Sequence, residues 1–150
     1  MTIPALTNLI AYIVVHGSYT APGQACSPEI INQWHINRNF DMAGYHLFID
    51  RDGAIIPGRP LWAMGAHCPA VNDRSWGICL FGGKAEGKAG WECNYTTAQF
   101  IALESLIFKL LEDDRVADDI EIGGHRDYDM ARECPGFNVK WWWRNREVLM

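Results

Sequence analysis

The alternation of apolar and polar segments along the chain predicts short buried strands separated by amphipathic helices. Residues 10–16, IAYIVVH, are apolar and rich in β-branched side chains, and Gly17 follows them, so we expect a buried strand that ends at His16. Residues 44–58, GYHLFIDRDGAIIPG, predict two strands joined by a turn at Asp52-Gly53, a strong hairpin signal. Further strands are expected in residues 75–83 and 120–124.

Two segments carry clear signals for the start of a helix. The helix expected in residues 27–40 has Ser27 as a candidate N-cap and Pro28 at its first position. The segment TTAQFIALESLIFKLLEDD is the clearest helix, because Thr96 and Gln99 fit a capping box and its apolar residues recur at helical spacing on one face. A last helix is expected in residues 137–149.

Strands that alternate with helices favour an α/β fold, and we expect one domain over residues 1–150 with a mixed central β-sheet flanked by α-helices. A chain of 150 residues with 49% hydrophobic content is suited to a single core. The formal net charge of -5 argues against a nucleic-acid partner bound through a broadly basic surface. We expect the acidic run at residues 111–121 to be a solvated face rather than a docking site.

The number of cysteines and the N-terminal sequence indicate the cellular compartment in which the protein is made. Five cysteines cannot all pair within one chain, so free thiols and cytosolic synthesis fit better than a disulfide framework. The apolar N-terminal run has no Lys or Arg ahead of it and is too short to span a bilayer, so we expect neither a signal peptide nor a membrane span. A single small domain further suggests a monomer.

Three side chains that could bind a metal stand at the ends of predicted elements. His16 closes the first strand, and His125 follows the strand at residues 120–124. Cys134 lies in the segment GGHRDYDMARECPGF, whose turn-forming residues predict a loop rather than a helix. In open α/β sheets, sites cluster beyond the carboxyl ends of strands, so the three could converge. Two imidazoles and a thiolate suit Zn²⁺, with the fourth position left to water.

Other interpretations of the same residues stay open at this point. A histidine at a strand end is more often a hydrogen-bonded core residue than a ligand. The pair His67-Cys68 is the main rival donor set, although neighbouring residues on an extended chain point apart. The run Trp141-Trp142-Trp143 could bind sugar, but successive helical residues point in different directions, which favours anchoring in the core.

Longer motifs add a family resemblance. Five segments occur in the order IVVHGSYT, INQWHINRNFDMAGYHLFIDRDGAIIPGRP, GAHCPAVNDRSWGICLFGG, TTAQFIALESLI and GGHRDYDMARECPGF. Together, from about Ala11 to Trp143, they resemble the type-2 N-acetylmuramoyl-L-alanine amidases, especially the small phage lysozymes of that family. Peptidoglycan recognition proteins share the fold, so the resemblance implies the same architecture here.

The resemblance also implies an activity and a set of site residues. The expected enzyme uses Zn²⁺ to cleave the amide between the lactyl group of N-acetylmuramic acid and the L-alanine that starts the peptide stem of bacterial peptidoglycan. The motifs place His16, His125 and Cys134 at the zinc ligands of the family. Tyr45 falls at its catalytic tyrosine.

The family resemblance also implies roles for three more residues. Arg132 stands where the phage enzymes usually carry lysine, two residues before the cysteine, and we expect it to act in catalysis through its charge. The loop that holds it is about one residue longer than in those enzymes. His67 and Asn72 are expected to contact substrate, with a structural turn as the alternative for that segment.

The resemblance further implies partners and a place of action. A phage or prophage endolysin is made in the host cytoplasm and reaches the cell wall after the membrane is breached. Some phage lysozymes of this kind also bind and inhibit their phage's RNA polymerase, which makes phage RNA polymerase a second partner to consider. A non-catalytic peptidoglycan-recognition module is the alternative. Cys134 favours the enzyme, because members of the fold that lack this ligand bind without cutting.

Overall fold

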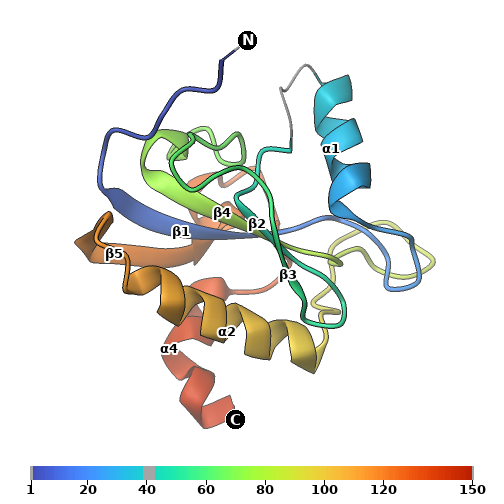
Figure 1. The fold of residues 1–150 in the computed structure, drawn as a ribbon. Coiled ribbons are helices and arrows are strands. Elements are labelled where there is room, and N and C mark those ends of the chain that lie inside the picture. Colours follow the sequence, from blue (N-terminus) through green and yellow to red (C-terminus); the bar gives the residue numbers. More distant parts are fainter. Residues whose placement is uncertain (1, 39–42, 150) are drawn as a thin grey trace.

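In a computed structural model that describes residues 2–38 and 43–149, helices flank a five-stranded β-sheet (Figure 1). The elements along the chain are β1 (Ile10–Gly17), α1 (Pro28–Asn37), β2 (Leu47–Ile49), β3 (Ile55–Pro57), the 3-10 helix η1 (Asn72–Arg74), β4 (Ser75–Leu80), α2 (Thr97–Leu111), β5 (Val116–Gly124), α3 (His125–Tyr128) and α4 (Val139–Leu149). None of the helices among these described residues has the length and apolar character needed to cross a bilayer.

The sheet is mixed, as the sequence predicts. Its strand order is β3-β2-β4-β1-β5. β1 pairs in parallel with both β4 and β5, β2 pairs in parallel with β4, and β3 closes the hairpin with β2 in the antiparallel sense. The strand that carries His16 therefore lies inside the sheet, and its carboxyl end is flanked by the carboxyl ends of two parallel neighbours.

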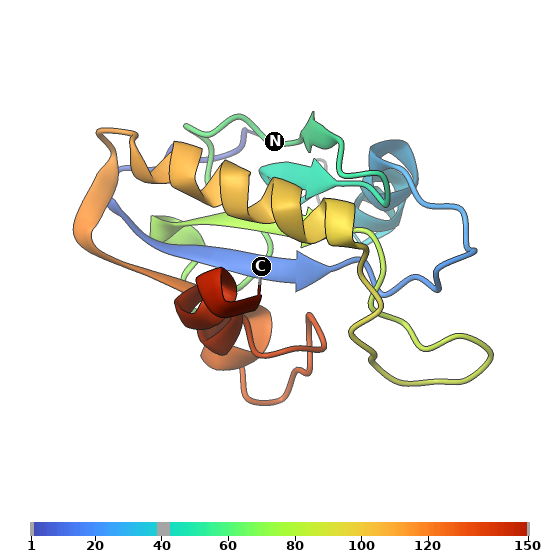
Figure 2. The same ribbon diagram turned by 90° about the horizontal axis from the view of Figure 1, so that it is seen from below.

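Alternate side chains of β1 point to opposite faces of the sheet and serve different purposes. Ile13 and Val15 are fully buried in the main hydrophobic core, which they share with α2 and α4. Val14 faces the other way and packs with Cys68 and Val71. Figure 2 shows α2 lying along the sheet with α4 beside it. His16, two residues after Val14, therefore projects on the face that α2 and α4 leave uncovered.

Local signals in the sequence account for most element boundaries. Ser27 caps α1 by accepting a hydrogen bond from the backbone N–H of Ile30, and Thr96 and Gln99 form the predicted capping box of α2. Gly53 supplies the positive φ of +87° in the turn between β2 and β3. Of the helix predicted over residues 27–40, the part at residues 39–40 lies outside the described residues.

Two expectations about the C-terminal third are wrong. The segment after residue 124 is not all loop, because His125 begins the single helical turn α3, whose start is fixed by the Asp127 carboxylate accepting the backbone N–H of Gly124 at 2.8 Å. The last strand also begins at Val116 rather than at residue 120. Its added residues include Asp118 and Asp119, which are exposed, as expected for a solvated face.

Candidate metal centre and catalytic cleft

His16 and His125 meet because their strands are neighbours in the sheet. His16 is 1% exposed at the end of β1, and His125 follows directly after β5, which pairs with β1 up to Val15 and Gly124. The two imidazole rings lie with their centroids 4.7 Å apart. Two residues 109 positions apart are thus brought into contact by parallel pairing alone.

Cys134 lies next to these two histidines on a loop that several hydrogen bonds hold in place. Its Sγ accepts a hydrogen bond from the backbone N–H of Gly17 at 3.3 Å, and its carbonyl accepts the backbone N–H of Arg126 at 2.9 Å. The next carbonyl, of Pro135, accepts the Tyr95 hydroxyl at 2.6 Å. These bonds tie the cysteine to the end of β1 and to the start of α3.

The three side chains fit a zinc ion. One donor atom from each of His16, His125 and Cys134 lies within 4.8 Å of the others, and His16 Nδ1 is 3.9 Å from Cys134 Sγ. Donors that share one zinc stand roughly 3–4 Å apart, given bonds of about 2.0–2.3 Å. The Nε2 atom of His125 is buried with no hydrogen-bond partner, a costly arrangement that a bound cation would relieve. Two nitrogens and one sulfur are a donor set that zinc prefers.

Burial sets the protonation of these groups in the absence of a cation. Desolvation lowers the pKa of His16 well below its ordinary value, helped by the neighbouring His67 and His125, so the ring is neutral near pH 7 and can act as a ligand. Desolvation also raises the pKa of Cys134 to about 12. A thiol with that pKa is protonated when no cation is bound, and it would lose its proton on binding one.

The donors lie in a cleft of about 520 Å³, large enough for part of a substrate chain. Its lining includes residues of α1, Tyr45 and the loop that carries Cys134. Besides the predicted residues, the cleft is lined by Tyr19, Trp34, Arg38, Trp91, Asp129 and Glu133. The sequence does not single out these six, because isolated aromatic and charged residues carry no pattern that distinguishes them from ordinary surface residues.

Comparison with known proteins agrees with this geometry. The profile of the N-acetylmuramoyl-L-alanine amidase family matches residues 6–137. The chain belongs to this family. It is 36% identical over 137 residues to the endolysins of Enterobacteria phage T3 and Escherichia phage T7, covering 91% of this chain and 87% of each relative.

Solved structures of the family share the fold of this amidase. The N-acetylmuramoyl-L-alanine amidase LysC from Clostridium intestinale superposes with a TM-score of 0.74 and 27% identity, covering 100% of this chain and 95% of that one. The bumblebee peptidoglycan-recognition protein PGRP-SA superposes with a TM-score of 0.77 and 27% identity, covering 96% and 86% of the two chains. Both the catalytic and the recognition branches of the fold are therefore represented among its neighbours.

Tyr45 lies beside the three candidate metal ligands of the amidase. Its ring centroid is 5.0 Å from that of His16, and its side chain lines the cleft. Desolvation raises the pKa of Tyr45 well above its ordinary value, and the nearby thiols of Cys79 and Cys134 act in the same direction. The hydroxyl is therefore protonated at neutral pH and available as a hydrogen-bond donor.

Arg132 lies at the rim of the cleft, two residues before the cysteine. Its side chain is 62% exposed, and its Nε atom lies 3.6 Å from the Asp129 carboxylate. The same carboxylate oxygen is 4.0 Å from His125 Nε2. Arg132 therefore brings a positive charge to the edge of the site, in an ion pair weakened by solvent.

His67 and Asn72 both line the cleft, and both also make contacts within the protein. The Asn72 side-chain oxygen accepts the backbone N–H groups of His67 and Cys68 at 3.0 and 2.8 Å, which is the structural turn considered from the sequence. Their contact with substrate stays a prediction. The rival donor pair does not form, because Cys68 is buried against Val14 and is absent from the described cluster of donors.

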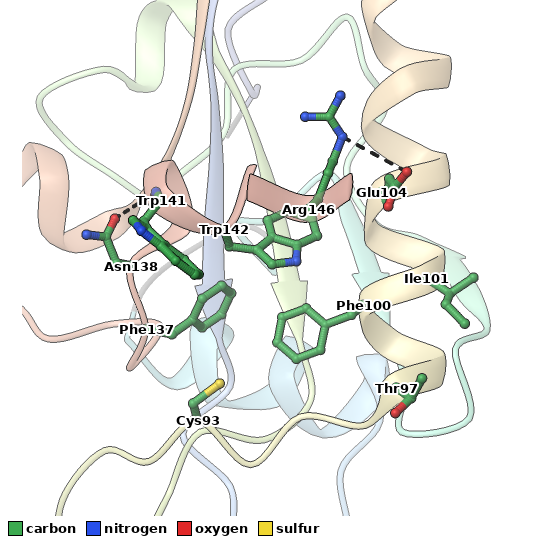
Figure 3. A pocket seen from close by; sticks show the side chains of 10 residues that line it. All are labelled: Cys93, Thr97, Phe100, Ile101, Glu104, Phe137, Asn138, Trp141, Trp142 and Arg146. Atoms are coloured by element: carbon green, nitrogen blue, oxygen red, sulfur yellow. Dashed lines mark hydrogen bonds and ion pairs between the residues drawn. The ribbon is translucent and has the colours of Figure 1, made fainter. Parts of the chain in front are cut away.

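A second pocket, of about 410 Å³, lies between α2 and α4 (Figure 3). Its walls are mainly the rings of Phe100, Phe137, Trp141 and Trp142. Trp142 is 8% exposed and belongs to the main core, as predicted, whereas Trp141 is 50% exposed. The residues that line this pocket include no histidine and none of the cleft residues.

Proposed function

We propose that this chain is a zinc-dependent endolysin that hydrolyses the amide between N-acetylmuramic acid and the L-alanine of the peptide stem in bacterial peptidoglycan. The observation that carries the proposal is the convergence of His16, His125 and Cys134 in an open cleft. The family match over residues 6–137 supports a single catalytic domain that occupies essentially the whole chain. The phage relatives, which are named endolysins, support action on the wall of the bacterial host after synthesis in its cytoplasm.

In the proposed mechanism, His16, His125 and Cys134 hold the ion. Bound zinc would supply a water of pKa about 7 and polarise the amide carbonyl. The cleft would orient the scissile amide beside the three ligands. The metal is needed because an amide is a poor electrophile and hydroxide is scarce at neutral pH.

Tyr45 and Arg132 would act on the charge that develops during hydrolysis. The Tyr45 hydroxyl is protonated and its ring lies beside that of His16, so it could donate a hydrogen bond to the oxygen of the tetrahedral intermediate. Arg132 holds a fixed charge at the rim and cannot give up a proton at neutral pH, so its contribution is electrostatic. Contact with phage RNA polymerase stays a prediction from the family resemblance.

The test is the kind of group released from purified peptidoglycan. We expect new free amino groups on L-alanine, their loss after treatment with a chelator, and their return when Zn²⁺ is added. Cys134→Ser should bind less metal and release few amino groups, whereas Cys93→Ser, which changes an exposed cysteine outside the cleft, should behave as wild type.

Two outcomes would contradict the proposal. Release of reducing sugar ends would mark cleavage of the glycan instead of the amide. Tight binding of muropeptide by a protein that contains no zinc and releases no amino groups would assign the chain to the recognition branch of the fold, which includes Drosophila relatives such as the 29% identical peptidoglycan-recognition protein SC2.

A further inference from the structure

From the candidate metal ligand His16, a line of contacts between three buried side chains leads through His67 to Ser75. His16 Nε2 lies 2.8 Å from His67 Nδ1, and His67 Nε2 lies 3.1 Å from the Ser75 hydroxyl. The exposed fractions of His16, His67 and Ser75 are 1%, 6% and 0%. Both ring nitrogens of His67 are therefore within hydrogen-bond distance of groups inside the protein.

The position of the His67 ring is fixed by the backbone around it. A Cβ added at Gly77 would lie 2.6 Å from His67 Cγ, and one added at Gly65 would lie 2.5 Å from His67 Cδ2. Only glycine permits so close an approach on both sides. The ring stands nearly perpendicular to that of His16, at 87°, in a T-shaped arrangement.

The hydrogen bond between the two histidines can form with either of two proton placements. If His16 carries its proton on Nε2, it donates to His67 Nδ1, and its own Nδ1 is free to face Cys134. If His67 donates instead, the proton of His16 moves to Nδ1, and this atom can no longer bind a cation. The second placement would put an N–H group among the three candidate ligand atoms.

We propose that His67 is a positioning residue, which holds His16 as the Nε2–H tautomer and so keeps His16 Nδ1 available to the metal, with Ser75 fixing His67 in turn. The inference rests on the proposed zinc site. Partners of this kind orient metal-binding histidines, and their loss typically costs about 10- to 100-fold in metal affinity. Here the partner is a second neutral imidazole rather than a carboxylate, so it adds no negative charge behind the ligand.

The first measurement uses the unaltered protein, free of zinc. Long-range ¹H–¹⁵N NMR correlations distinguish the two neutral tautomers of a histidine ring. We expect His16 to carry its proton on Nε2 and His67 to do the same. A His16 ring protonated on Nδ1 would overturn the inference, whatever the activity of the enzyme.

The second measurement is the zinc dissociation constant, obtained by competition with a chelator. His67→Phe keeps a ring but removes the acceptor, and we expect it to weaken zinc binding by about 10- to 100-fold. His67→Gln, which retains an acceptor and a donor, should recover part of this loss, and it replaces the phenylalanine variant if that one does not fold. His46→Gln is the matched control: His46 is as deeply buried, at 1% exposed, but its hydrogen bonds go to Ala63 and Gly77 rather than to His16.

The outcomes separate this inference from the proposed function. Wild-type zinc affinity in both His67 variants, with normal hydrolysis by the wild type, would overturn the positioning role alone. A wild type that binds zinc but releases no amino groups would overturn the proposed function, while the affinity ratio of the variants would still support the positioning role. Equal weakening in His46→Gln would show a general effect of losing a buried histidine and would count against the inference.

Discussion

Arg132 offers a direct test of how charge contributes at the rim of the cleft. Its guanidinium is exposed and carries a fixed charge, so Arg132→Lys should retain most of the hydrolytic rate, whereas Arg132→Ala should lower kcat by about 10²- to 10³-fold if it acts on the oxyanion. The measurement is kcat on purified peptidoglycan. Arg126→Ala is the control, because Arg126 lies in the same segment but outside the cleft. A lysine variant much faster than wild type would instead indicate proton transfer at this position.

We predict that the folded protein loses stability in mild acid because His46 is buried in its neutral form. Its Nδ1 accepts the Gly77 N–H, its Nε2 donates to the Ala63 carbonyl, and burial lowers its pKa to about 4 from an ordinary 6.5. Between these values the unfolded chain binds a proton and the folded chain does not, so the free energy of unfolding falls as pH drops from 6.5 towards 4. The slope is about 1.4 kcal/mol per pH unit for one such group.

Denaturant unfolding at several pH values measures this slope, and His46→Gln should flatten it by about one proton. The other buried histidines have pKa values lowered in the same direction, so the variant should reduce the slope and not abolish it. An unchanged slope would show that His46 is protonated in the folded protein at a higher pH than its burial implies.

At this scale, the sequence identifies the donors but not their surroundings. His16, His125 and Cys134 could be named because each adjoins a strand end or a rigid turn and matches a family motif. The contact between His16 and His67 could not, because it joins residues 51 positions apart and depends on which strands are neighbours. Hydrogen-bond partners of this kind follow from packing, which leaves no local trace in the sequence.

At the scale of the structural elements, the turn at residues 134–136 is held in place by a hydrogen bond from the buried Tyr95 hydroxyl. The Tyr95 O–H donates to the Pro135 carbonyl at 2.6 Å, and Tyr95 is 8% exposed. Tyr95→Phe would leave that buried carbonyl without this donor, so we expect the free energy of unfolding to drop by about 1–3 kcal/mol. Denaturant unfolding measures the change. Tyr19→Phe is the control, because the Tyr19 hydroxyl accepts its hydrogen bond at an exposed site, and its loss should cost little. Equal losses in both variants would contradict the structural role assigned to Tyr95.

Helices and strands were predicted accurately where a few neighbouring residues determine their ends, and less accurately elsewhere. The starts of α1 and α2 were predicted because capping is decided within four residues. β5 was predicted too short, because it lies at the edge of the sheet and exposes Asp118 and Asp119, which obscures the apolar pattern of a strand. The single turn α3 was missed because four residues are too few to establish a helical period.

For the whole molecule, the strand order is what converts scattered residues into a site. The order β3-β2-β4-β1-β5 places the end of β1 next to the start of α3, although β5 is the last strand in the chain. The sequence favoured an α/β sheet with helices around it, but no local pattern specifies which strands pair. The family resemblance implied the same fold, but the strand order itself came only from the structure.

Because the proposed ligands come from both ends of the chain, zinc should stabilise the fold as a whole. Only the folded protein brings His16, His125 and Cys134 within reach of one ion, so zinc at 100 times its dissociation constant should raise the free energy of unfolding by about 2.7 kcal/mol. Denaturant unfolding with zinc and with chelator measures this difference. It should disappear in Cys134→Ser and persist in Cys93→Ser, whose side chain lies outside the cluster. Equal zinc stabilisation in both variants would show that the ion binds elsewhere, and no stabilisation in the wild type would show that the three donors do not form a zinc site.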